Sequence, residues 1–219
     1  MNSGELSPRS VRVLLFDLGG VVFAFDFGRA FKRWSQSCGR TAAELEREFS
    51  FDDAYERHER GEIDAAEYLT SLRNTLKADL SESEFVAGWN AIYLEAISGI
   101  STMLGAASKH FPLYAFTNSN PTHQQAWSKM FERELAYFKK VFVSSELGRR
   151  KPEREAFLDV SRQIGATPNE VLFFDDTSAN VDGAISAGMQ GVVVRTPEDV
   201  GRALAWLGVD LEPPGPRTN

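Results

Sequence analysis

One short stretch decides the fold: VLLFDLGGVVF, from Val13 to Phe23. Five of its first six residues are apolar, which is typical of a parallel strand that is covered on both faces. The strand ends in a single carboxylate, Asp17, and the glycine pair Gly19–Gly20 follows in the turn. Because glycine lets a backbone approach a ligand closely, this strand end is a candidate binding site.

Further apolar segments along the chain are also predicted to be strands, and helical patterns separate them. The predicted strands are 11–18, which contains the start of the opening stretch, and 112–118, 140–145, 170–176 and 191–196. One helical pattern has Phe157, Val160 and Ile164 at helical spacing and stops at Gly165. Strands that alternate with helices predict an α/β fold, a doubly wound Rossmann-like parallel sheet.

The connection after the first strand is much longer than this pattern allows. A βαβ unit takes roughly 30 residues, but the second predicted strand begins only at residue 112. Amphipathic helical segments fill the gap, and three of them begin at Thr41, Asp64 and Ser81, which are common N-cap types. We therefore predict an α-helical domain inserted into the core, with disordered tails. The predicted boundaries are 11–24 and 96–210 for the core, 25–95 for the insert, and 1–10 and 211–219 for the tails.

The composition of the chain limits the kinds of molecule that it is expected to bind. The chain has 219 residues, one cysteine, Cys38, and a formal net charge of -7. A single cysteine cannot form an internal disulfide and suits a reducing cytoplasm. The acidic balance argues against nucleic acid, and no apolar run approaches the roughly 20 residues that a membrane span needs. We expect a cytoplasmic protein that binds a small molecule, without nucleic-acid or membrane partners, as a monomer or weak homodimer.

Polar residues follow four of the predicted strands, at the edge where open α/β sheets bind ligands. In chain order these are Asp17; Thr117 and Asn118; Lys151; and Asp175, Asp176 and Asn180. Carboxylates are ligands for Mg²⁺, whereas a lysine, a hydroxyl and an amide can bind phosphoryl oxygens. The combination predicts a site for a divalent cation and a phosphate.

Taken singly, most of these residues have simpler explanations. Asp17 could cap a turn, Thr117 and Asn118 are common in turns, and Lys151 could be a surface lysine. The adjacent acids Asp175 and Asp176 are harder to explain this way, because neighbouring carboxylates at the end of a buried strand repel each other unless a cation or donors hold them. The ordered set favours a functional site.

Four motifs carry a resemblance to a known family. In chain order, FDLGG, FTNSN, RRKP and FFDDTSANVDGAISAG resemble the motifs of the haloacid dehalogenase superfamily. The inserted domain resembles the helical cap of that superfamily. Within it, ERHERGEIDAAEYL and FVAGWNAIY are similar to a bacterial phosphatase branch that includes α-D-glucose-1-phosphate phosphatase.

The resemblance implies a Mg²⁺-dependent phosphomonoester hydrolase. Asp17 would be the nucleophile and would form an aspartyl-phosphate that water then hydrolyses. Mg²⁺ is the implied cofactor, and its implied ligands are Asp17, the backbone carbonyl of Gly19, Asp176 and, through water, Asp175. The implied phosphate-binding groups are Thr117, the amide of Asn118 and Lys151, with Asn180 supporting the site.

One position departs from the family pattern. Most phosphatases of the superfamily have a second aspartate two residues after the nucleophile, which protonates the leaving oxygen, whereas this chain has Gly19. The loss fits a phosphatase for esters that leave easily, such as sugar 1-phosphates, and a sugar phosphate is the preferred substrate class. It also leaves two alternatives: a 2-haloacid dehalogenase, against which the pair Asp175–Asp176 argues, and a binding or regulatory protein with little turnover.

Substrate selectivity is expected to lie in the inserted domain. The segment YERHERGEI offers Arg57, His58 and Arg60 just before Gly61, where we expect a turn. We expect these three side chains to contact the substrate, although a solvated helix end would carry the same residues.

Overall fold

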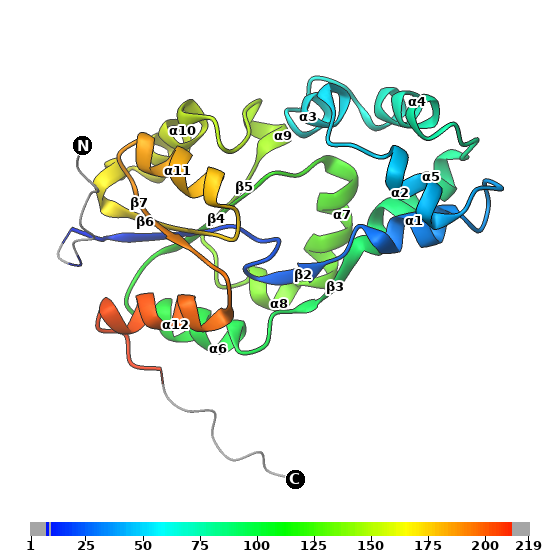
Figure 1. Ribbon diagram of the computed structural model, residues 1–219. Helices are drawn as coiled ribbons and strands as arrows, with labels where there is room; N and C mark the ends of the chain where they lie inside the picture. Colours follow the sequence, from blue (N-terminus) through cyan, green and yellow to red (C-terminus); the bar gives the residue numbers. More distant parts are fainter. Residues whose placement is uncertain (1–7, 9, 212–219) are drawn as a thin grey trace, which may run out of the picture.

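The computed structural model describes residue 8 and residues 10–211 (Figure 1). The predicted disordered tails, 1–10 and 211–219, therefore fall almost entirely outside the described residues. The main sheet is parallel and has the strand order β5-β4-β1-β6-β7. Its strands are β1 (Val13–Phe16), β4 (Leu113–Thr117), β5 (Val141–Val143), β6 (Val171–Asp175) and β7 (Gln190–Val193). The predicted α/β class and parallel sheet are confirmed, and each strand lies within or beside its predicted segment.

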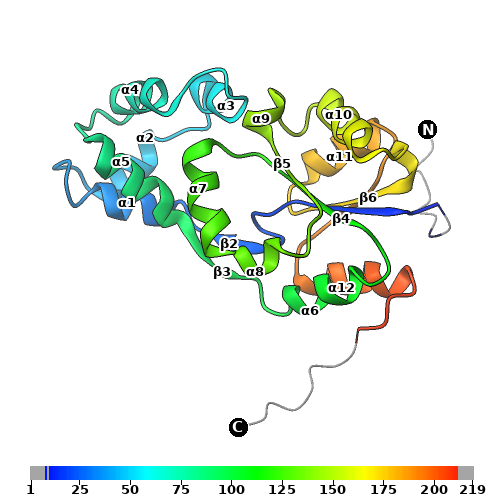
Figure 2. The same cartoon turned by 180° about the vertical axis from the view of Figure 1, so that it is seen from behind.

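Helices cover both faces of the sheet (Figures 1 and 2). On one face, Leu14 and Phe16 of β1 belong to a buried cluster with α6 (Ile100–Ala107) and α12 (Pro197–Trp206). On the other face, Val13 and Leu15 belong to a second cluster. That cluster includes residues of α10 (Arg154–Ile164) and α11 (Ser178–Ser186). Burial on both faces explains why β1 is a continuous apolar run.

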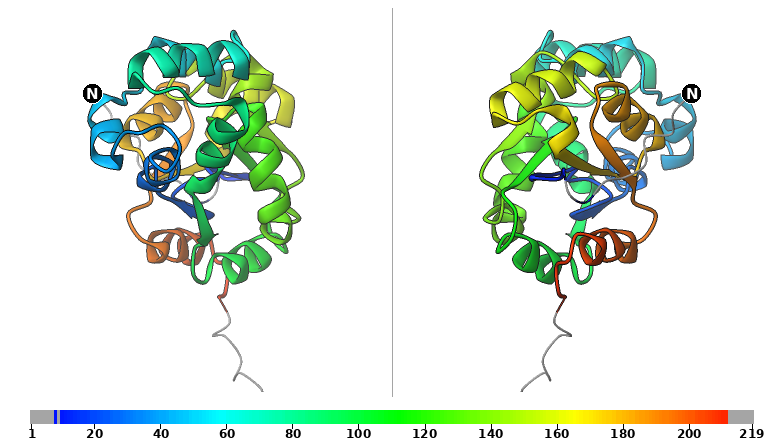
Figure 3. Two further views of the ribbon diagram at one scale, coloured as in Figure 1. Left: turned by 90° about the vertical axis from the view of Figure 1, so that its right-hand side faces the viewer. Right: turned by 90° about the vertical axis from the view of Figure 1, so that its left-hand side faces the viewer.

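A helical domain, which we call the cap, lies between β1 and β4 in the sequence. Its N-caps at Thr41, Asp64 and Ser81 are confirmed, because each side chain accepts a hydrogen bond from the amide three residues later. Viewed along the long axis, the cap stands in front of the carboxyl ends of the sheet (Figure 3). Its helices are α1 (Gly28–Trp34), α2 (Ala42–Glu48), α3 (Asp53–Glu59), α4 (Ala65–Leu76) and α5 (Glu82–Trp89).

A two-stranded ribbon that the sequence did not predict joins the cap to the core. The predicted helical segment that begins at Ser81 is shorter than the gap that it was expected to fill, because α5 ends at Trp89 and a 3-10 turn, η1 (Asn90–Ile92), follows. The chain then forms β3 (Tyr93–Ala96), which pairs antiparallel with β2 (Phe23–Phe25). The aromatic and branched side chains in this stretch suit a strand, and the strand's partner lies far away in the sequence.

The cap packs on the core through aromatic side chains. Trp34 and Trp89 of the cap are fully buried, and the ring of Trp89 stacks on His123 of the core with centroids 4.7 Å apart. The same buried cluster continues from these residues to Leu14 and Phe16 below the sheet. Cap and core therefore share one hydrophobic core, which holds the cap against the edge where the strands end.

Short helices complete the fold. Gly165 ends α10, as predicted, and has a left-handed backbone. The helix begins only at Arg154, so Lys151 lies in the loop before it and not at a helix start.

No helix among residues 10–211 is both long and apolar enough to cross a membrane. The remaining elements are α7 (Pro121–Met130), α8 (Glu132–Leu135), α9 (Ser144–Leu147) and η2 (Pro168–Glu170).

Candidate active site

The carboxylate at the end of β1 is held in a fixed position. The Asp17 amide donates to the Phe174 carbonyl at 2.8 Å, which continues the pairing of β1 with β6. The Asp17 side chain accepts a hydrogen bond from the Leu18 amide at 2.7 Å through Oδ1. Only 8% of the residue is exposed. Asp17 is therefore largely shielded from solvent at the sheet edge.

Lys151 is buried between two of the predicted acids. Its Nζ lies 2.9 Å from Oδ1 of Asp17 and 2.6 Å from Oδ2 of Asp175, and 1% of its side chain is exposed. Burial alone would lower the pKa of Lys151, but the attraction of Asp17 and Asp175 outweighs it, so the net pKa is raised. The ammonium group therefore stays charged at the centre of the site.

Asp175 accepts hydrogen bonds on both oxygens from protein groups. The side-chain amide of Asn180 lies 3.0 Å from each oxygen, and the Thr177 amide donates to Oδ1 at 2.8 Å. Together with Lys151, these donors fix Asp175 at the fully buried end of β6. Asp175 thus orients the lysine, and its predicted contact with a metal through water stays a prediction.

The three acids form a cluster that suits a divalent cation. Oxygens of Asp17, Asp175 and Asp176 lie within 4.8 Å of one another. Burial raises the pKa of Asp17 to about 7; Lys151 opposes this and Asp175 adds to it. Burial and then Asp175 also raise the pKa of Asp176. Three carboxylates against one ammonium leave two negative charges, and Mg²⁺ would neutralise them with the oxygen ligands that it prefers.

Gly20 allows Asp176 to approach the turn after β1. The residue has a φ of +74°, and a Cβ there would lie 2.3 Å from Oδ2 of Asp176. Any larger residue would displace this carboxylate from the acid cluster. Glycine is therefore required at position 20 both by the backbone of the turn and by the position of Asp176 in the site.

A Gly20→Ala variant tests this requirement. We expect it to raise the Mg²⁺ concentration that half-saturates the acid cluster by roughly tenfold or more, because Asp176 must shift. A calorimetric titration with Mg²⁺ measures the change. Gly165→Ala is the matched control, since Gly165 has a similar φ of +79° but nothing lies within 4 Å of its Cβ position. An equal effect in both variants would show that backbone strain alone is responsible.

The end of β4 brings two predicted phosphate-binding residues to the same edge. Thr117 is buried and ends the strand. The side chain of Asn118 accepts from the Lys151 amide at 2.8 Å and donates to the Lys151 carbonyl at 2.9 Å. This pair of hydrogen bonds fixes the lysine loop. The Asn118 side chain therefore serves the loop, and the predicted phosphate contact falls to its backbone amide.

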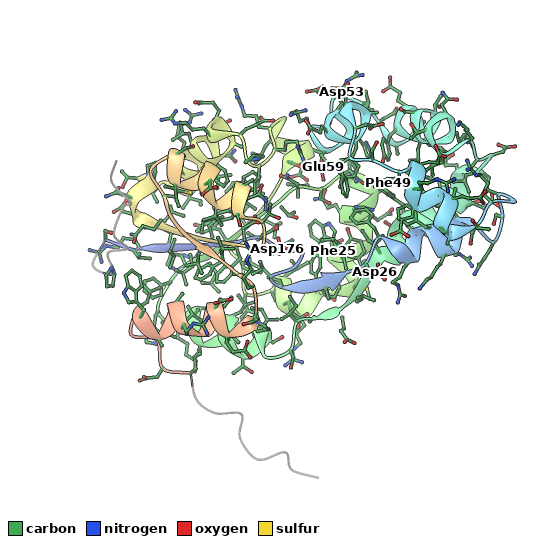
Figure 4. All side chains as sticks on the ribbon, in the orientation of Figure 1. Phe25, Asp26, Phe49, Asp53, Glu59 and Asp176 are labelled. Atoms are coloured by element: carbon green, nitrogen blue, oxygen red, sulfur yellow. The ribbon has the colours of Figure 1, made fainter. Side chains whose placement is uncertain are left out.

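A cavity of about 580 Å³ opens over these residues, between the sheet edge and the cap. Figure 4 labels Glu59 of the cap, Phe25 of the ribbon and Asp176 of the core, and all three line this cavity. The sequence reasoning missed several lining residues because only the packing of the cap on the core brings them to the site. They are Phe25, Phe27, Phe51, Tyr55, Glu59 and Arg150.

The three cap residues expected to contact substrate, Arg57, His58 and Arg60, do not line this cavity, and their contact with substrate stays a prediction. Arg57 lies 3.4 Å from Glu62 and is half exposed. His58 is buried, with its ring stacked on Tyr68. Arg60 pairs with Glu153 at 2.8 Å and so links the cap to the core. These residues lie on α3 or at its end, and the helix presents other residues to the site. The periodicity of α3 could have indicated this, since Tyr55 and Glu59 are four residues apart.

A larger residue at Gly19 would press on the ring of Phe25. A Cβ at this position would lie 3.0 Å from Cε1 and 3.2 Å from Cδ1 of Phe25. The ring of Phe25 therefore occupies the space beside the Gly19 α-carbon. Gly19 itself lines the cavity with Asp17, so its backbone is available to the site while its side-chain position is closed.

The amino-acid sequence of this chain is similar to those of known phosphate-ester hydrolases. Flavin mononucleotide hydrolase 1 of Arabidopsis thaliana is 31% identical over 125 residues, which are 56% of this chain and 48% of that protein. This chain therefore matches about half the length of that relative. D-ribitol-5-phosphate phosphatase of Bacteroides thetaiotaomicron is 25% identical over 78% of this chain and 85% of its own length.

A solved structure extends the likeness to the fold. A HAD family enzyme of Bacteroides thetaiotaomicron, in complex with magnesium and inorganic phosphate, superposes with a TM-score of 0.72 at 25% identity. The match covers 85% of this chain and 95% of that one. A family model described as haloacid dehalogenase-like hydrolase matches residues 11–188. The chain therefore belongs to the haloacid dehalogenase-like hydrolase family.

Proposed function

We propose that the protein is a Mg²⁺-dependent phosphomonoesterase that works through an aspartyl-phosphate. One observation carries the proposal: Lys151 lies within 2.9 Å of Asp17 and 2.6 Å of Asp175, while Asp176 completes an acid cluster within 4.8 Å. A buried cation beside a fixed carboxylate provides a binding site for a phosphoryl group and a nucleophile in line with it.

Each residue has a role in this reaction. Asp17 attacks phosphorus and later leaves it when water attacks. Lys151, the Thr117 hydroxyl and the Asn118 amide bind the nonbridging oxygens, where negative charge must be stabilised. Asn180 and Asp175 hold Lys151 in place. When bound to Asp17, Asp176 and the carbonyl of Gly19, Mg²⁺ would neutralise the charges of the phosphate and the acids.

A small phosphorylated metabolite, preferably a sugar or polyol phosphate, is the proposed substrate. The named relatives act on ribitol 5-phosphate and flavin mononucleotide, which supports a small organic phosphate. The cavity combines aromatic rings with the ion pair of Glu59 and Arg150. Rings can pack against the carbon skeleton of such a substrate while Arg150 binds its hydroxyl groups.

The alternatives suit this site less well. A haloacid dehalogenase has no need for paired acids, whereas here Asp175 and Asp176 lie beside the nucleophile. A binding protein without turnover has no need for a lysine held within hydrogen-bond distance of that nucleophile. Both observations favour the phosphatase.

Phosphate release from a panel of phosphorylated sugars and polyols tests the proposal. We expect release with Mg²⁺ and a fall of at least about 10²-fold after chelation with EDTA, restored by added Mg²⁺. Halide release from 2-chloropropionate, measured in parallel, should be undetectable. Halide release that ignores EDTA would instead identify a dehalogenase, and no release of either product would indicate a binding protein.

A further inference from the structure

The site lacks a proton carrier at the position where the family usually has one. Gly19 has no side chain, and the ring of Phe25 fills the space beside it. An alkyl phosphate nevertheless releases a strongly basic alkoxide unless a proton reaches the leaving oxygen. If the proposed phosphatase cleaves alkyl phosphates, another residue must supply that proton.

Most titratable groups that line this cavity or the smaller one beside it, within residues 10–211, are unsuited to the task. Burial raises the pKa of Tyr55 and Tyr93 well above the ordinary value, so neither releases a proton readily. Burial lowers the pKa of His123 to about 3, so this imidazole holds no proton to give. Lys151 is committed to Asp17 and Asp175, and a guanidinium such as that of Arg150 does not deprotonate. Outside the acid cluster, Glu59 is the remaining candidate.

Glu59 has the surroundings that such a role needs. It ends α3, is 4% exposed and lines the cavity together with Asp17. Nε of Arg150 contacts Oε2 of Glu59 at 2.9 Å, and Tyr55 hydrogen-bonds its carboxylate. Burial raises the pKa of Glu59, while Arg150, Tyr55 and Lys151 oppose the rise. Arg150 is shared with Glu56, which it contacts at 3.0 Å, and Glu56 is also paired with Arg60 at 3.0 Å.

We propose that Glu59 of the cap is the general acid and base of the reaction, in place of the acid that Gly19 cannot provide. The proposal rests on the phosphatase activity proposed above. It makes the cap a part of the chemistry, because the proton carrier comes from α3 and reaches the site only when the cap lies against the sheet edge. Arg150, from the core, positions the carboxyl group.

The two steps balance as follows. In the first, an oxygen of Asp17 bonds to phosphorus, the bond from phosphorus to the leaving oxygen breaks, and the proton of the Glu59 carboxyl group passes to that oxygen. The products are an alcohol, the aspartyl-phosphate and the Glu59 carboxylate. In the second, water attacks phosphorus and gives a proton to Glu59, the bond to Asp17 breaks, and inorganic phosphate and both original side chains are restored.

A Glu59→Gln variant of the full chain, assayed with Mg²⁺ on two probes, tests the assignment. D-ribitol 5-phosphate has an alkoxide leaving group that needs a proton, whereas p-nitrophenyl phosphate releases a phenolate that does not. We expect kcat/KM to fall by about 10²-fold or more for ribitol 5-phosphate and by less than about threefold for p-nitrophenyl phosphate. Wild-type activity on ribitol 5-phosphate should also decline on the alkaline side as Glu59 loses its proton, and the variant should lack that decline.

Glu62→Gln is the matched control, because Glu62 lies just after α3 and pairs with Arg57 at 3.4 Å but neither touches Arg150 nor lines the cavity. It should leave the ratio of the two activities unchanged. Equal losses on both probes in Glu59→Gln, or the same ratio change in Glu62→Gln, would overturn the assignment and indicate a structural role. Wild-type release from p-nitrophenyl phosphate alone would also overturn it. Wild-type release from no phosphoester at all would instead refute the proposed function.

Discussion

Replacing Asp17 by Asn is expected to reduce phosphate release by at least about 10³-fold while the protein stays folded. The amide is too weak a nucleophile to form the acyl-phosphate, yet it has nearly the shape of the carboxyl group. Lys151 keeps its contact with Asp175 at 2.6 Å, so the variant removes an acid without leaving the ammonium group unpaired. Initial rates measure the loss, and circular dichroism checks the fold.

Asp182→Asn is the control for this variant. Asp182 is exposed on α11, and the same chemical change there should leave the rate unaltered. Mass spectrometry of rapidly quenched wild-type enzyme should detect a phosphorylated peptide that contains Asp17 and that the Asn variant lacks. A variant that keeps its rate within about tenfold of the wild type would exclude Asp17 as the nucleophile.

Replacing Lys151 by Met is expected to affect stability as well as activity. The change leaves Asp17 and Asp175 buried without their ammonium partner, which typically lowers the free energy of unfolding by about 3–5 kcal/mol. Activity should fall by at least about 10²-fold, because the phosphoryl charge loses a fixed cation. Urea denaturation in EDTA measures the first effect, and added Mg²⁺ should reverse part of it by neutralising the same carboxylates.

The double variant Lys151→Met/Asp175→Asn separates the two effects. Removing the acid together with its partner should restore much of the stability but none of the activity, so the two substitutions should be strongly non-additive in unfolding. Lys129→Met, at an exposed lysine of α7, should change neither property. Additive stability losses would show that the ion pair at 2.6 Å is not what holds Lys151.

The core of the fold was predictable because its signals are local. Continuous apolar runs marked the parallel strands, and N-cap residues such as Thr41 and Ser81 marked helix starts within a few residues. The ribbon of β2 and β3 was not predictable in this way, since Phe25 pairs with Tyr93 across the whole cap. A pairing between segments so distant in sequence leaves no local pattern. The helical spacing of the residues before β3 also continues towards it, so the sequence predicts a helix where the strand lies.

The candidate site shows the same difference between residues with a local signal and residues that only the tertiary packing brings together. Asp17, Lys151 and Asp176 could be expected together because topology fixes where parallel strands end, and the structure brings them to one edge. The cap residues needed more information, since the four-residue spacing of Tyr55 and Glu59 marks one side of α3 but does not say that this side faces the core. Arg57 carries an attractive charge but is half exposed beside Glu62, whereas Glu59, two residues later, is buried at the cavity.

The contact between Gly19 and Phe25 limits how the enzyme could change by mutation. A single substitution of Gly19 by Asp would place the new Cβ about 3.0 Å from the ring of Phe25, so the acid could be accommodated only after the ring had moved or shrunk. Phe25 is 41% exposed, so its ring has solvent on one side into which it can give way. The size of side chain that position 19 tolerates therefore depends on the residue at position 25, and the two positions are coupled in mutation.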